Sequence, residues 1–577
     1  MSEGPRRRLQ LLCTLLVGLL IVIVAQLFKV QVVDHEFYLD WARHQREREI
    51  TIAKSPRGLI RDRNGDLLVG NTITYDIGAS TEDVNEEGLD QDAAKLAAVL
   101  HMPAAHIRRL LMQKNEENWV WLARSTSREV AETVTALHVP NVGVESRWRR
   151  EYPEGPLASH VLGFCNADVS ECFCGVEEFY DVALHSEPIT WTGSLDSGND
   201  QIPWAVAPVE LPEPGETLVL TLDRGVQALV EEALAEAVAH YQAEGGTIIV
   251  MDPRTFGILA LAGIPDYNPA TPYAYADQPE GPFASPAVSK QYEPGSVFKV
   301  LTVAAALDSG TVTPGTTYHD QGVIEVGGEA YRNASRQAYG QQTIDRILIK
   351  SLNVGSAWLG VQMGPDTFYR YLQRFGIGER TEVDLADEVT GKLWTPADIG
   401  EWDDSLLGAN AFGQGVAVTP MQMISAIATV ANDGERLRPH VVAQRITADG
   451  AVSNYQAAPV ARVISPEVAD QVTDMLVRAV EEEIEEAHVP GYRVAGKTGT
   501  AEIPVPGGYT DEETIVTFVG YGPVPDPSLV VLVKLDRPKA SHWAHDTAAP
   551  TFGRLMGQLF NVMGVPPHGL AVAEAME

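Results

Sequence analysis

The sequence is short of positive charge. It holds 43 Lys and Arg residues against 78 Asp and Glu in 577 positions, which gives a formal net charge of −35. Proteins that bind nucleic acid concentrate Lys and Arg on one face or along one helix. The composition therefore argues against a nucleic-acid partner, and we interpret the acidic excess as a solubilising surface.

Cysteine is scarce as well, with four residues in the chain. Cys13 lies in an apolar N-terminal run, whereas Cys165, Cys172 and Cys174 lie close together. A metal site needs more ligands than these three, and no histidine lies among them, so we expect no metal and no cofactor. An oxidising compartment allows one local disulfide with one thiol left over, and the sequence leaves the pairing open.

One long apolar run stands at the N-terminus. Arg6, Arg7 and Arg8 precede an uncharged stretch over Leu9–Phe28, which is long enough to cross a bilayer as a helix. This stretch is longer than a signal-peptide core, and no A-x-A-like cleavage site follows it. By the positive-inside rule, the arginines stay in the cytoplasm. We therefore expect a cytoplasmic tail over 1–8, a single-pass anchor in the cell (inner) membrane over 9–28, and nearly all of the chain outside the cytoplasm.

Beyond the anchor, the chain shows no internal repeat and no low-complexity tract, so we divide it by its changes of pattern. Residues 30–48 predict a helix that continues out of the membrane, and Asn64-Gly65 predicts a hairpin turn. Mixed helices and short strands follow, to about residue 184. Residues 186–214 are rich in Pro, Gly, Ser and Asp and predict a linker.

The C-terminal part has strands at both ends and helices between them. A helix over 419–431 is opened by Thr419-Pro420 as N-cap and first position. Because the strands come from distant segments, we predict an α/β domain whose sheet joins the two ends. The predicted strands cover 217–222, 247–251, 258–262, 514–519 and 529–535.

Three short motifs stand in one order along this part: Ser296-Val297-Phe298-Lys299, Ser351-Leu352-Asn353 and Lys497-Thr498-Gly499-Thr500. Each is weak alone, because such short patterns occur by chance. In this order they are typical of enzymes that transfer acyl groups through a serine. They supply a nucleophile, an amine base, a proton-relay hydroxyl and a cationic strand for an anionic substrate.

Ser296 and Lys299 open an apolar segment. Residues 297–307 are apolar almost throughout, which predicts a buried helix that begins at or near Ser296. Residues three apart share one helix face, so the Lys299 amine can reach the Ser296 hydroxyl. Burial and the positive helix N-terminus both lower the pKa of a lysine. We predict that Ser296 is the nucleophile and neutral Lys299 its general base; the alternative, a capping serine beside a lysine that reaches the surface, fits the apolar surroundings less well.

Ser351-Leu352-Asn353 lies between two apolar stretches, and a plain helix N-cap is the alternative for Asn353. In the functional interpretation, Ser351 relays a proton to the leaving amine and Asn353 hydrogen-bonds the substrate backbone. The order of the motifs favours this interpretation.

Lys497-Thr498-Gly499-Thr500 lies in a segment of small residues. Glycine in a strand marks a place where another backbone approaches, and we attribute this approach to a substrate peptide that adds alongside the strand. Lys497 and the hydroxyls of Thr498 and Thr500 suit a terminal carboxylate. The backbone N–H groups of Thr500 and Ser296 predict an oxyanion hole.

Together with the anchor, these motifs resemble those of the class B (monofunctional) penicillin-binding proteins, which are peptidoglycan D,D-transpeptidases. Segments ahead of the catalytic motifs also resemble this family: Arg57-Gly58-Leu59-Ile60-Arg61-Asp62-Arg63-Asn64-Gly65, Arg150-Glu151-Tyr152-Pro153 and Gly175-Val176-Glu177. The resemblance implies an α/β (α+β) penicillin-binding-protein/β-lactamase-like transpeptidase domain over 215–565. A pedestal (dimerisation-type) domain over 29–185 and the linker over 186–214 would precede it, and a tail over 566–577 would follow.

The resemblance also implies a reaction. Ser296 would attack the carbonyl of the penultimate D-Ala of a stem peptide, the terminal D-Ala would leave, and an amine of a neighbouring stem would resolve the acyl-enzyme. β-Lactams would acylate the same serine. Residues 292–296 and 412–415 resemble the division-specific branch more than the elongation-specific one, which implies a SEDS-type glycan polymerase and the division complex as partners.

Two alternatives remain. One is a hydrolase of the same fold, a D,D-carboxypeptidase or a β-lactamase, although no E-x-x-L-N segment with a deacylating glutamate lies between Ser351 and Lys497. The other is a non-catalytic β-lactam sensor or division scaffold with a vestigial site, although the tail before Leu9 is short for a signalling domain. No E-D-x-x-F-x-x-H segment of a glycosyltransferase is present either.

Overall fold

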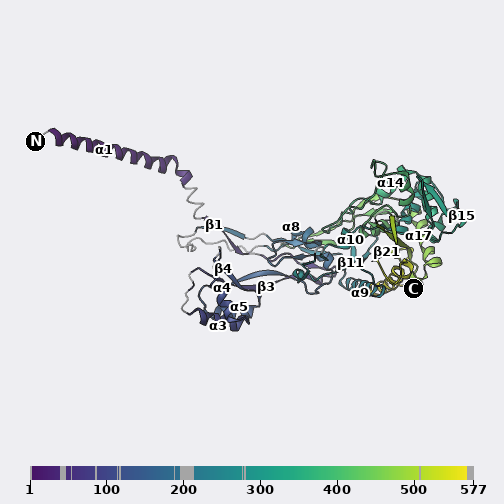
Figure 1. The fold of residues 1–577 in the computed structure, drawn as a ribbon, viewed down its shortest axis with the longest axis horizontal. Coiled ribbons are helices and arrows are strands. Elements are labelled where there is room, and N and C mark those ends of the chain that lie inside the picture. Colours follow the sequence, from purple (N-terminus) through teal and green to yellow (C-terminus); the bar gives the residue numbers. More distant parts are fainter. Residues whose placement is uncertain are drawn as a thin grey trace. The chain divides into compact units, whose positions relative to one another are not determined.

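The computed structural model divides into two units, one over Met1–Pro56 and Ser186–Gly215, the other over Arg57–His185 and Glu216–Glu577. Figure 1 labels their helices and strands. The structure describes residues 3–38, 47–53, 55–82, 84, 88–113, 115, 118–186, 189–194, 213–275, 277–278, 281–505 and 508–567.

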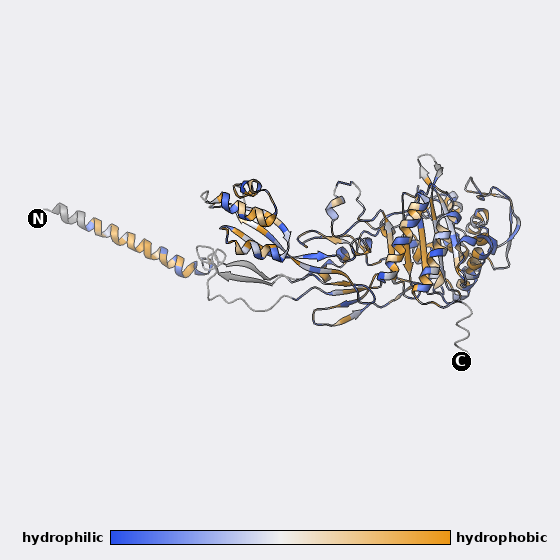
Figure 2. Cartoon of the chain, turned by 90° about the horizontal axis from the view of Figure 1, so that it is seen from below, coloured by the Kyte–Doolittle hydropathy of each residue, from blue (hydrophilic) through white to orange (hydrophobic). Residues whose placement is uncertain are grey.

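The first unit contains the predicted anchor. Helix α1 (Glu3–Phe28) continues into a π-helical turn over Lys29–Val33, and the stretch Gln10–Val33 is apolar and long enough to cross a membrane. Its large side chains are exposed, and Figure 2 shows the hydrophobic residues along this helix. An apolar helix without a protein core around it is compatible with a single-pass anchor.

A two-stranded ladder forms the rest of the described part of this unit. Strand β1 (Glu47–Ala53) pairs antiparallel with β8 (Ile189–Ser194), with Glu47 opposite Ser194. The predicted helix over 30–48 is therefore wrong at its C-terminal end, and a strand lies inside the predicted linker. The pairing partners are far apart in sequence, so local periodicity does not reveal them.

The second unit begins with a three-stranded lobe. The long strand β3 pairs with both β4 and β5, and three helices pack on this sheet around Ile77, Leu96 and Ile107. Asn64-Gly65 lies in the turn between β2 and β3, as predicted. The elements are β2 (Ile60–Arg61), β3 (Leu67–Ser80), α3 (Leu89–Leu100), α4 (Ala104–Leu111), β4 (Trp119–Thr126), α5 (Arg128–Ala136) and β5 (Val142–Glu151).

The sheet of this lobe continues into later parts of the chain. Its order is β18-β17-β9-β2-β3-β4, in which β2 lies parallel to β9 (Thr217–Leu220), and β17 (Val442–Ile446) pairs with both β9 and β18 (Val452–Asn454). Strands from three distant segments thus share hydrogen bonds, which joins the predicted pedestal to the predicted transpeptidase domain within this unit.

A buried ionic cluster connects the segments that carried the family resemblance. The Glu177 carboxylate accepts from Arg57 Nε at 2.7 Å and pairs with Arg150 at 2.7 Å, and Arg57 also reaches Asp181 at 2.6 Å. The two arginines and Glu177 are almost fully buried. Buried charges need such partners, because an unpaired charge in the interior is costly.

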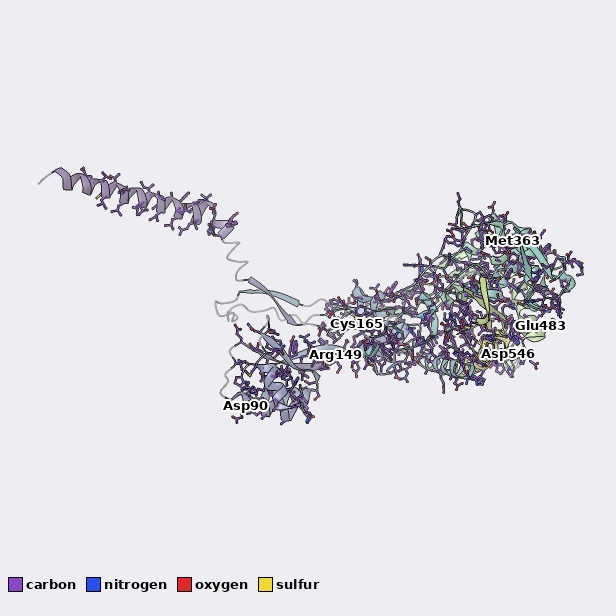
Figure 3. All side chains as sticks on the ribbon, in the orientation of Figure 1. Asp90, Arg149, Cys165, Met363, Glu483 and Asp546 are labelled. Carbon is purple, nitrogen blue, oxygen red and sulfur yellow. A yellow bond between two sulfur atoms is a disulfide. The ribbon has the colours of Figure 1, made fainter. Side chains whose placement is uncertain are left out.

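The cysteines lie close to this cluster. Cys165, labelled in Figure 3, forms a disulfide with Cys172, and Cys174 stays a free, buried thiol. One local disulfide with one thiol left over is what the sequence predicted, and the structure settles the pairing. Burial raises the pKa of Cys174 to about 12, so this thiol stays protonated at neutral pH.

The core of the later domain is an antiparallel sheet of order β11-β10-β22-β21-β20. In Figure 1 the teal strand β11 and the yellow strand β21 belong to this one sheet, so distant segments are joined as predicted. Helices α9 and α18 contact the sheet on the side of one apolar cluster, and α16 packs in the other. The bounds are α9 (Arg224–Tyr241), β10 (Gly245–Met251), β11 (Ile258–Ile264), α16 (Pro420–Ala431), β20 (Ala495–Val505), β21 (Gly508–Gly522), β22 (Leu529–Asp536) and α18 (Ala548–Val562).

Helices and two small hairpins fill the middle of this domain. Thr419 caps α16 as predicted: its hydroxyl accepts from Gln422 N, and the Gln422 side chain accepts from Thr419 N. The hairpin strands pair β12 with β15 and β13 with β14. The bounds are α11 (Lys299–Asp308), β12 (Thr317–Asp320), β13 (Val323–Val326), β14 (Glu329–Arg332), β15 (Gly340–Thr343), α12 (Asp345–Ile349), α13 (Asn353–Met363), α14 (Pro365–Arg374), α15 (Asp404–Asn410) and α17 (Pro466–Glu483).

Candidate active site

Ser296 lies on a short turn that leads into a buried helix. A 3-10 turn over Gly295–Phe298 is followed directly by α11, and every residue of α11 up to Leu307 is buried. This confirms the predicted apolar helix that begins near Ser296. The serine is therefore held on a rigid element rather than on a free loop.

Lys299 is fully buried one turn after Ser296. Its Nζ donates to the backbone oxygen of Ser351 at 2.6 Å and to Ser351 Oγ at 3.1 Å. Burial, reinforced by the neighbouring charge of Lys497, lowers the pKa of Lys299 well below its ordinary value. The lowered pKa favours the neutral amine, and in the described part of the chain its hydrogen bonds join it to the second motif rather than to Ser296 Oγ.

The second motif lies in the turn between α12 and α13. Ser351 has a positive φ of 55°, and α13 begins at Asn353 and ends at Met363, which Figure 3 labels. The N-cap position of α13 is occupied by Leu352, whose side chain makes no capping bond. The alternative of Asn353 as a plain N-cap is therefore wrong. Its Nδ2 donates to the backbone oxygen of Arg332 at 2.9 Å.

The third motif lies on β20, the edge strand of the sheet. Lys497 is buried, and its Nζ donates to the backbone oxygen and the Oγ1 of Thr498, both at 3.2 Å. Burial lowers the pKa of Lys497 to about 7. The Oγ1 of Thr500 accepts from Ala544 N at 3.2 Å. An edge strand that carries a titratable cation can pair with an extended peptide that ends in a carboxylate.

Gly499 faces the turn of the nucleophile. A Cβ at this position would lie 2.7 Å from Pro294 O and 2.9 Å from Val297 Cγ2. We predicted a close approach of another backbone here and assigned it to a bound peptide, but the approaching backbone is the chain's own turn around Ser296. Gly499 thereby lets β20 and the turn of Ser296 lie against each other.

The Ser296 turn is held from its other side by Gly413. The backbone oxygen of Gly413 accepts from Gly295 N at 3.1 Å, and a Cβ on Gly413 would overlap Gly295 O. The backbone of Thr500 also lies against Gly295, so the two N–H groups predicted to form an oxyanion hole come from adjoining segments. Their role in binding an oxyanion stays a prediction.

The three motifs converge. Lys299 connects Ser296's helix to Ser351 through hydrogen bonds, its pKa responds to the charge of Lys497, and Gly499 packs against the Ser296 turn. An amine of lowered pKa, two hydroxyls and a second, titratable amine on adjoining segments are groups that acyl transfer can use. The roles of Asn353, Thr498 and Thr500 toward a substrate remain predictions.

One cavity lies beside the residues that flank the first and third motifs. It has a volume of about 910 Å³ and is lined by Tyr292, Glu293, Gly415, Ala501 and Glu502, among others. The predicted catalytic side chains are not among the residues that line it.

Two residues outside the motifs also reach the site. The side-chain oxygen of Asn333 accepts from the backbone N–H of Val354, the residue after Asn353. The side-chain nitrogen of Asn333 donates to the carboxylate of Asp320. Sequence reasoning missed both, because they lie in the hairpin segment before the second motif and follow no recognisable pattern.

Comparison with known families agrees with this geometry. Residues 246–557 match the model of the penicillin binding protein transpeptidase domain. Residues 52–172 match that of the penicillin-binding protein dimerisation domain. Both ranges fall inside the domains predicted from the sequence, whose exact boundaries stay predictions.

Known proteins match this chain along nearly its whole length. Stage V sporulation protein D of Bacillus subtilis is 33% identical over 97% of this chain and 87% of its own length. The peptidoglycan D,D-transpeptidase FtsI of Escherichia coli is 26% identical over 99% of this chain and 94% of its own length. Among solved structures, penicillin binding protein 3 of Mycobacterium tuberculosis in complex with aztreonam is 27% identical, with a TM-score of 0.68 over 89% of this chain and 97% of that one.

The transpeptidase model alone matches more than half of the chain, and the 33%-identical relative matches nearly all of it. The chain therefore belongs to the class B penicillin-binding proteins, in which a dimerisation domain precedes a transpeptidase domain.

Proposed function

We propose that this transpeptidase cross-links the stem peptides of peptidoglycan through an acyl-enzyme on Ser296. One observation carries the proposal: a lysine whose pKa is lowered by burial lies one turn after Ser296 and hydrogen-bonds the serine of the second motif. A neutral amine in this place can act as a base at neutral pH, which an exposed lysine cannot.

In the acylation step, Lys299 takes the proton of Ser296 Oγ. The oxygen attacks the carbonyl carbon of the penultimate D-Ala, and the N–H groups of Ser296 and Thr500 receive the developing oxyanion. When the C–N bond breaks, the proton passes from Lys299 to Ser351 Oγ, 3.1 Å away, and on to the nitrogen of the leaving D-Ala. The products are an ester on Ser296 and free D-Ala, with Lys299 neutral again.

The third motif would hold the substrate. In its protonated form, Lys497 attracts the terminal carboxylate, and the hydroxyls of Thr498 and Thr500 add hydrogen bonds. The bound carboxylate favours the charged form of Lys497, whose pKa of about 7 leaves it partly neutral without a partner. Asn353 would hold the amide of the peptide that remains on the enzyme.

In the second step, an amine of a neighbouring stem attacks the ester carbon and loses its proton through Ser351 and Lys299. The new amide is the cross-link, and Ser296 is released. A β-lactam would acylate Ser296 in the same way, but its amine stays tethered to the acyl group and does not depart.

Covalent labelling of the full-length protein with a fluorescent penicillin tests the nucleophile. We expect the label on the wild type and its loss in Ser296→Ala. Ser309→Ala, a serine beyond the C-terminus of α11, is the matched control and should keep the label. Persistent labelling of Ser296→Ala would disprove the assignment.

The same protein, given donor and acceptor stems, distinguishes transfer from hydrolysis. Cross-linked dimers are the expected product. Release of D-Ala without dimers would instead show a D,D-carboxypeptidase, and rapid release of the penicillin would show a β-lactamase. Acylation by penicillin without any reaction of the stems would leave the β-lactam sensor, and no acylation at all by a folded protein would leave the division scaffold.

We further propose that the chain is anchored by α1 with its catalytic domain outside the cytoplasm, and that it works in septal wall synthesis beside a SEDS-type polymerase. The apolar helix and the resemblance of residues 292–296 and 412–415 to the division branch support this proposal. A fluorescently tagged copy should concentrate at the division site, and an even distribution along the side wall would speak for the elongation branch.

A further inference from the structure

Helix α13, which begins at Asn353, takes its N-terminal cap from a distant residue. The N-cap position is Leu352, which has no side-chain oxygen to offer the free backbone N–H groups of the first turn. Asn333 supplies it: its Oδ1 accepts from Val354 N at 3.1 Å. Asn333 is 3% exposed, so this bond is made in the interior.

Asp320 fixes the orientation of Asn333. The Nδ2 of Asn333 lies 3.0 Å from both carboxylate oxygens of Asp320, which is fully buried, and Gly322 N also donates to Asp320 at 2.7 Å. A carboxylate accepts hydrogen bonds only, so it must face the amide nitrogen of Asn333. The carbonyl of Asn333 is thereby turned toward α13.

The backbone of the same segment also hydrogen-bonds the side chain of Asn353 in the second motif. The backbone oxygen of Arg332, the residue before Asn333, accepts from Asn353 Nδ2 at 2.9 Å. Because Asn333 already caps the helix, the Asn353 side chain is not drawn back to the helix N-terminus. Among the residues that the structure describes, none hydrogen-bonds its Oδ1 or its second amide hydrogen, so both can bind a ligand.

We propose that Asp320 and Asn333 are positioning residues, which orient Asn353 and the turn of Ser351 toward the peptide amide of the substrate. The inference rests on the proposed function and deepens it, since it names what sets the geometry of the amide-binding group. Asp320 ends β12 and Asn333 follows β14, so the two small hairpins serve as the support of the second motif.

The test compares two β-lactams in the full-length protein. Benzylpenicillin carries an acylamino side chain that offers an amide to Asn353, whereas 6-aminopenicillanic acid lacks the acyl group. In Asn333→Asp, two carboxylates face each other in the interior and displace the cap. We expect the acylation rate with benzylpenicillin to fall by up to about 100-fold, the size of effect that a small misplacement of a binding group produces. Acylation by 6-aminopenicillanic acid should change much less.

A double exchange should rescue the enzyme. In the Asp320→Asn/Asn333→Asp variant, the carboxylate at position 333 still accepts from Val354 N–H and from the amide now at position 320. A negative group at a helix N-terminus is also favourable. We expect the ratio of the benzylpenicillin acylation rate to the 6-aminopenicillanic acid acylation rate to return close to that of the wild type. Asn454→Asp, an exposed change on β18 (Val452–Asn454), controls for the added charge.

Three results would overturn the inference. The first is that Asn333→Asp slows acylation by both β-lactams equally, which would show a structural role only. The second is that the double exchange fails to restore the ratio of the benzylpenicillin rate to the 6-aminopenicillanic acid rate. The third is that Asn333→Asp leaves this ratio and both rates unchanged. If Asn333→Asp does not fold, Asp320→Asn alone, which replaces the buried carboxylate by an amide, must still lower the ratio of the benzylpenicillin rate to the 6-aminopenicillanic acid rate. A wild type that no β-lactam acylates would instead refute the proposed function, and the two failures are thus distinguishable.

Discussion

At the scale of single residues, the proposed mechanism gives two buried lysines opposite tasks. Lys299 must be neutral to accept a proton, whereas Lys497 must be charged to hold a carboxylate. Burial lowers the pKa of both, and the charge of Lys497 lowers that of Lys299 further. The same desolvation therefore helps the base and weakens the anion-binding group until the substrate arrives.

The acylation rate should accordingly pass through a maximum as pH changes. It rises as Lys299 loses its proton, at a pH well below the ordinary pKa of a lysine. It falls again as Lys497 loses its own, near or above pH 7, because the pKa of Lys497 is about 7 and the bound carboxylate raises it. Lys497→Arg, whose charge persists at all accessible pH values, should lose the alkaline fall. The rate of penicillin acylation, measured as a function of pH, checks this prediction. Lys539→Arg, at an exposed position, is the control. An alkaline fall that persists in Lys497→Arg would contradict this account.

A second prediction at the scale of single residues concerns Gly499. In Gly499→Ala, the new methyl group meets the backbone of Pro294, so β20 and the Ser296 turn must move apart. We expect penicillin acylation to fall by about 10- to 100-fold, since the nucleophile shifts relative to the oxyanion-binding N–H groups. Gly315→Ala, where a Cβ meets nothing within 4 Å, is the control. Unchanged acylation in Gly499→Ala would show that the turn can yield without loss.

At the scale of elements, the structure is held by contacts between segments that the sequence separates widely. The loop before β2, strand β5 and the short helix α7 (Gly175–Phe179) meet through the charges of Arg57, Arg150 and Glu177. The sequence indicated each segment through its family motif, yet it did not show that the motifs form one cluster. In the same way, it placed the helix after Ser351 but not the distant residue that caps it.

Removal of the central charge should destabilise this junction. Glu177→Gln leaves two buried guanidinium groups without their shared carboxylate, which we expect to cost about 3–5 kcal/mol of unfolding free energy. Thermal unfolding of the detergent-solubilised protein checks it. Glu132→Gln, which breaks an exposed pair with Arg128, should change the unfolding midpoint far less, because water and salt screen such a pair. Equal midpoints for the two variants would contradict a structural role of the cluster.

At the scale of the whole molecule, the sequence was most informative where the pattern is local. The anchor, the helices over 299–308 and 420–431, and the central strands were predicted with errors at their ends. The strand over 47–53 and its partner inside the predicted linker were missed, since an isolated ladder follows from pairing and not from composition.

The anchor carries a prediction at this scale. In Leu16→Arg/Leu20→Arg, two charges enter the middle of the apolar helix, at about 2.5–3.5 kcal/mol each. The protein should then be released in part from the membrane fraction by an alkaline wash, while Leu16→Ala/Leu20→Ala stays bound. Full retention of the arginine variant would mean that another part of the chain holds it to the membrane.

The sequence alone determined the reaction class and pointed to candidate residues for it, because Ser296, Lys299, Ser351 and Lys497 stand in short motifs whose order along the chain can be recognised. It also determined the apolar helix and the core strands, which depend on local hydrophobic patterns. Only the tertiary structure decided the disulfide partner, the ionic cluster, the backbone that faces Gly499 and the support of Asn353 by Asn333 and Asp320. These features depend on which distant segments pack together, and packing leaves no periodic trace in the chain.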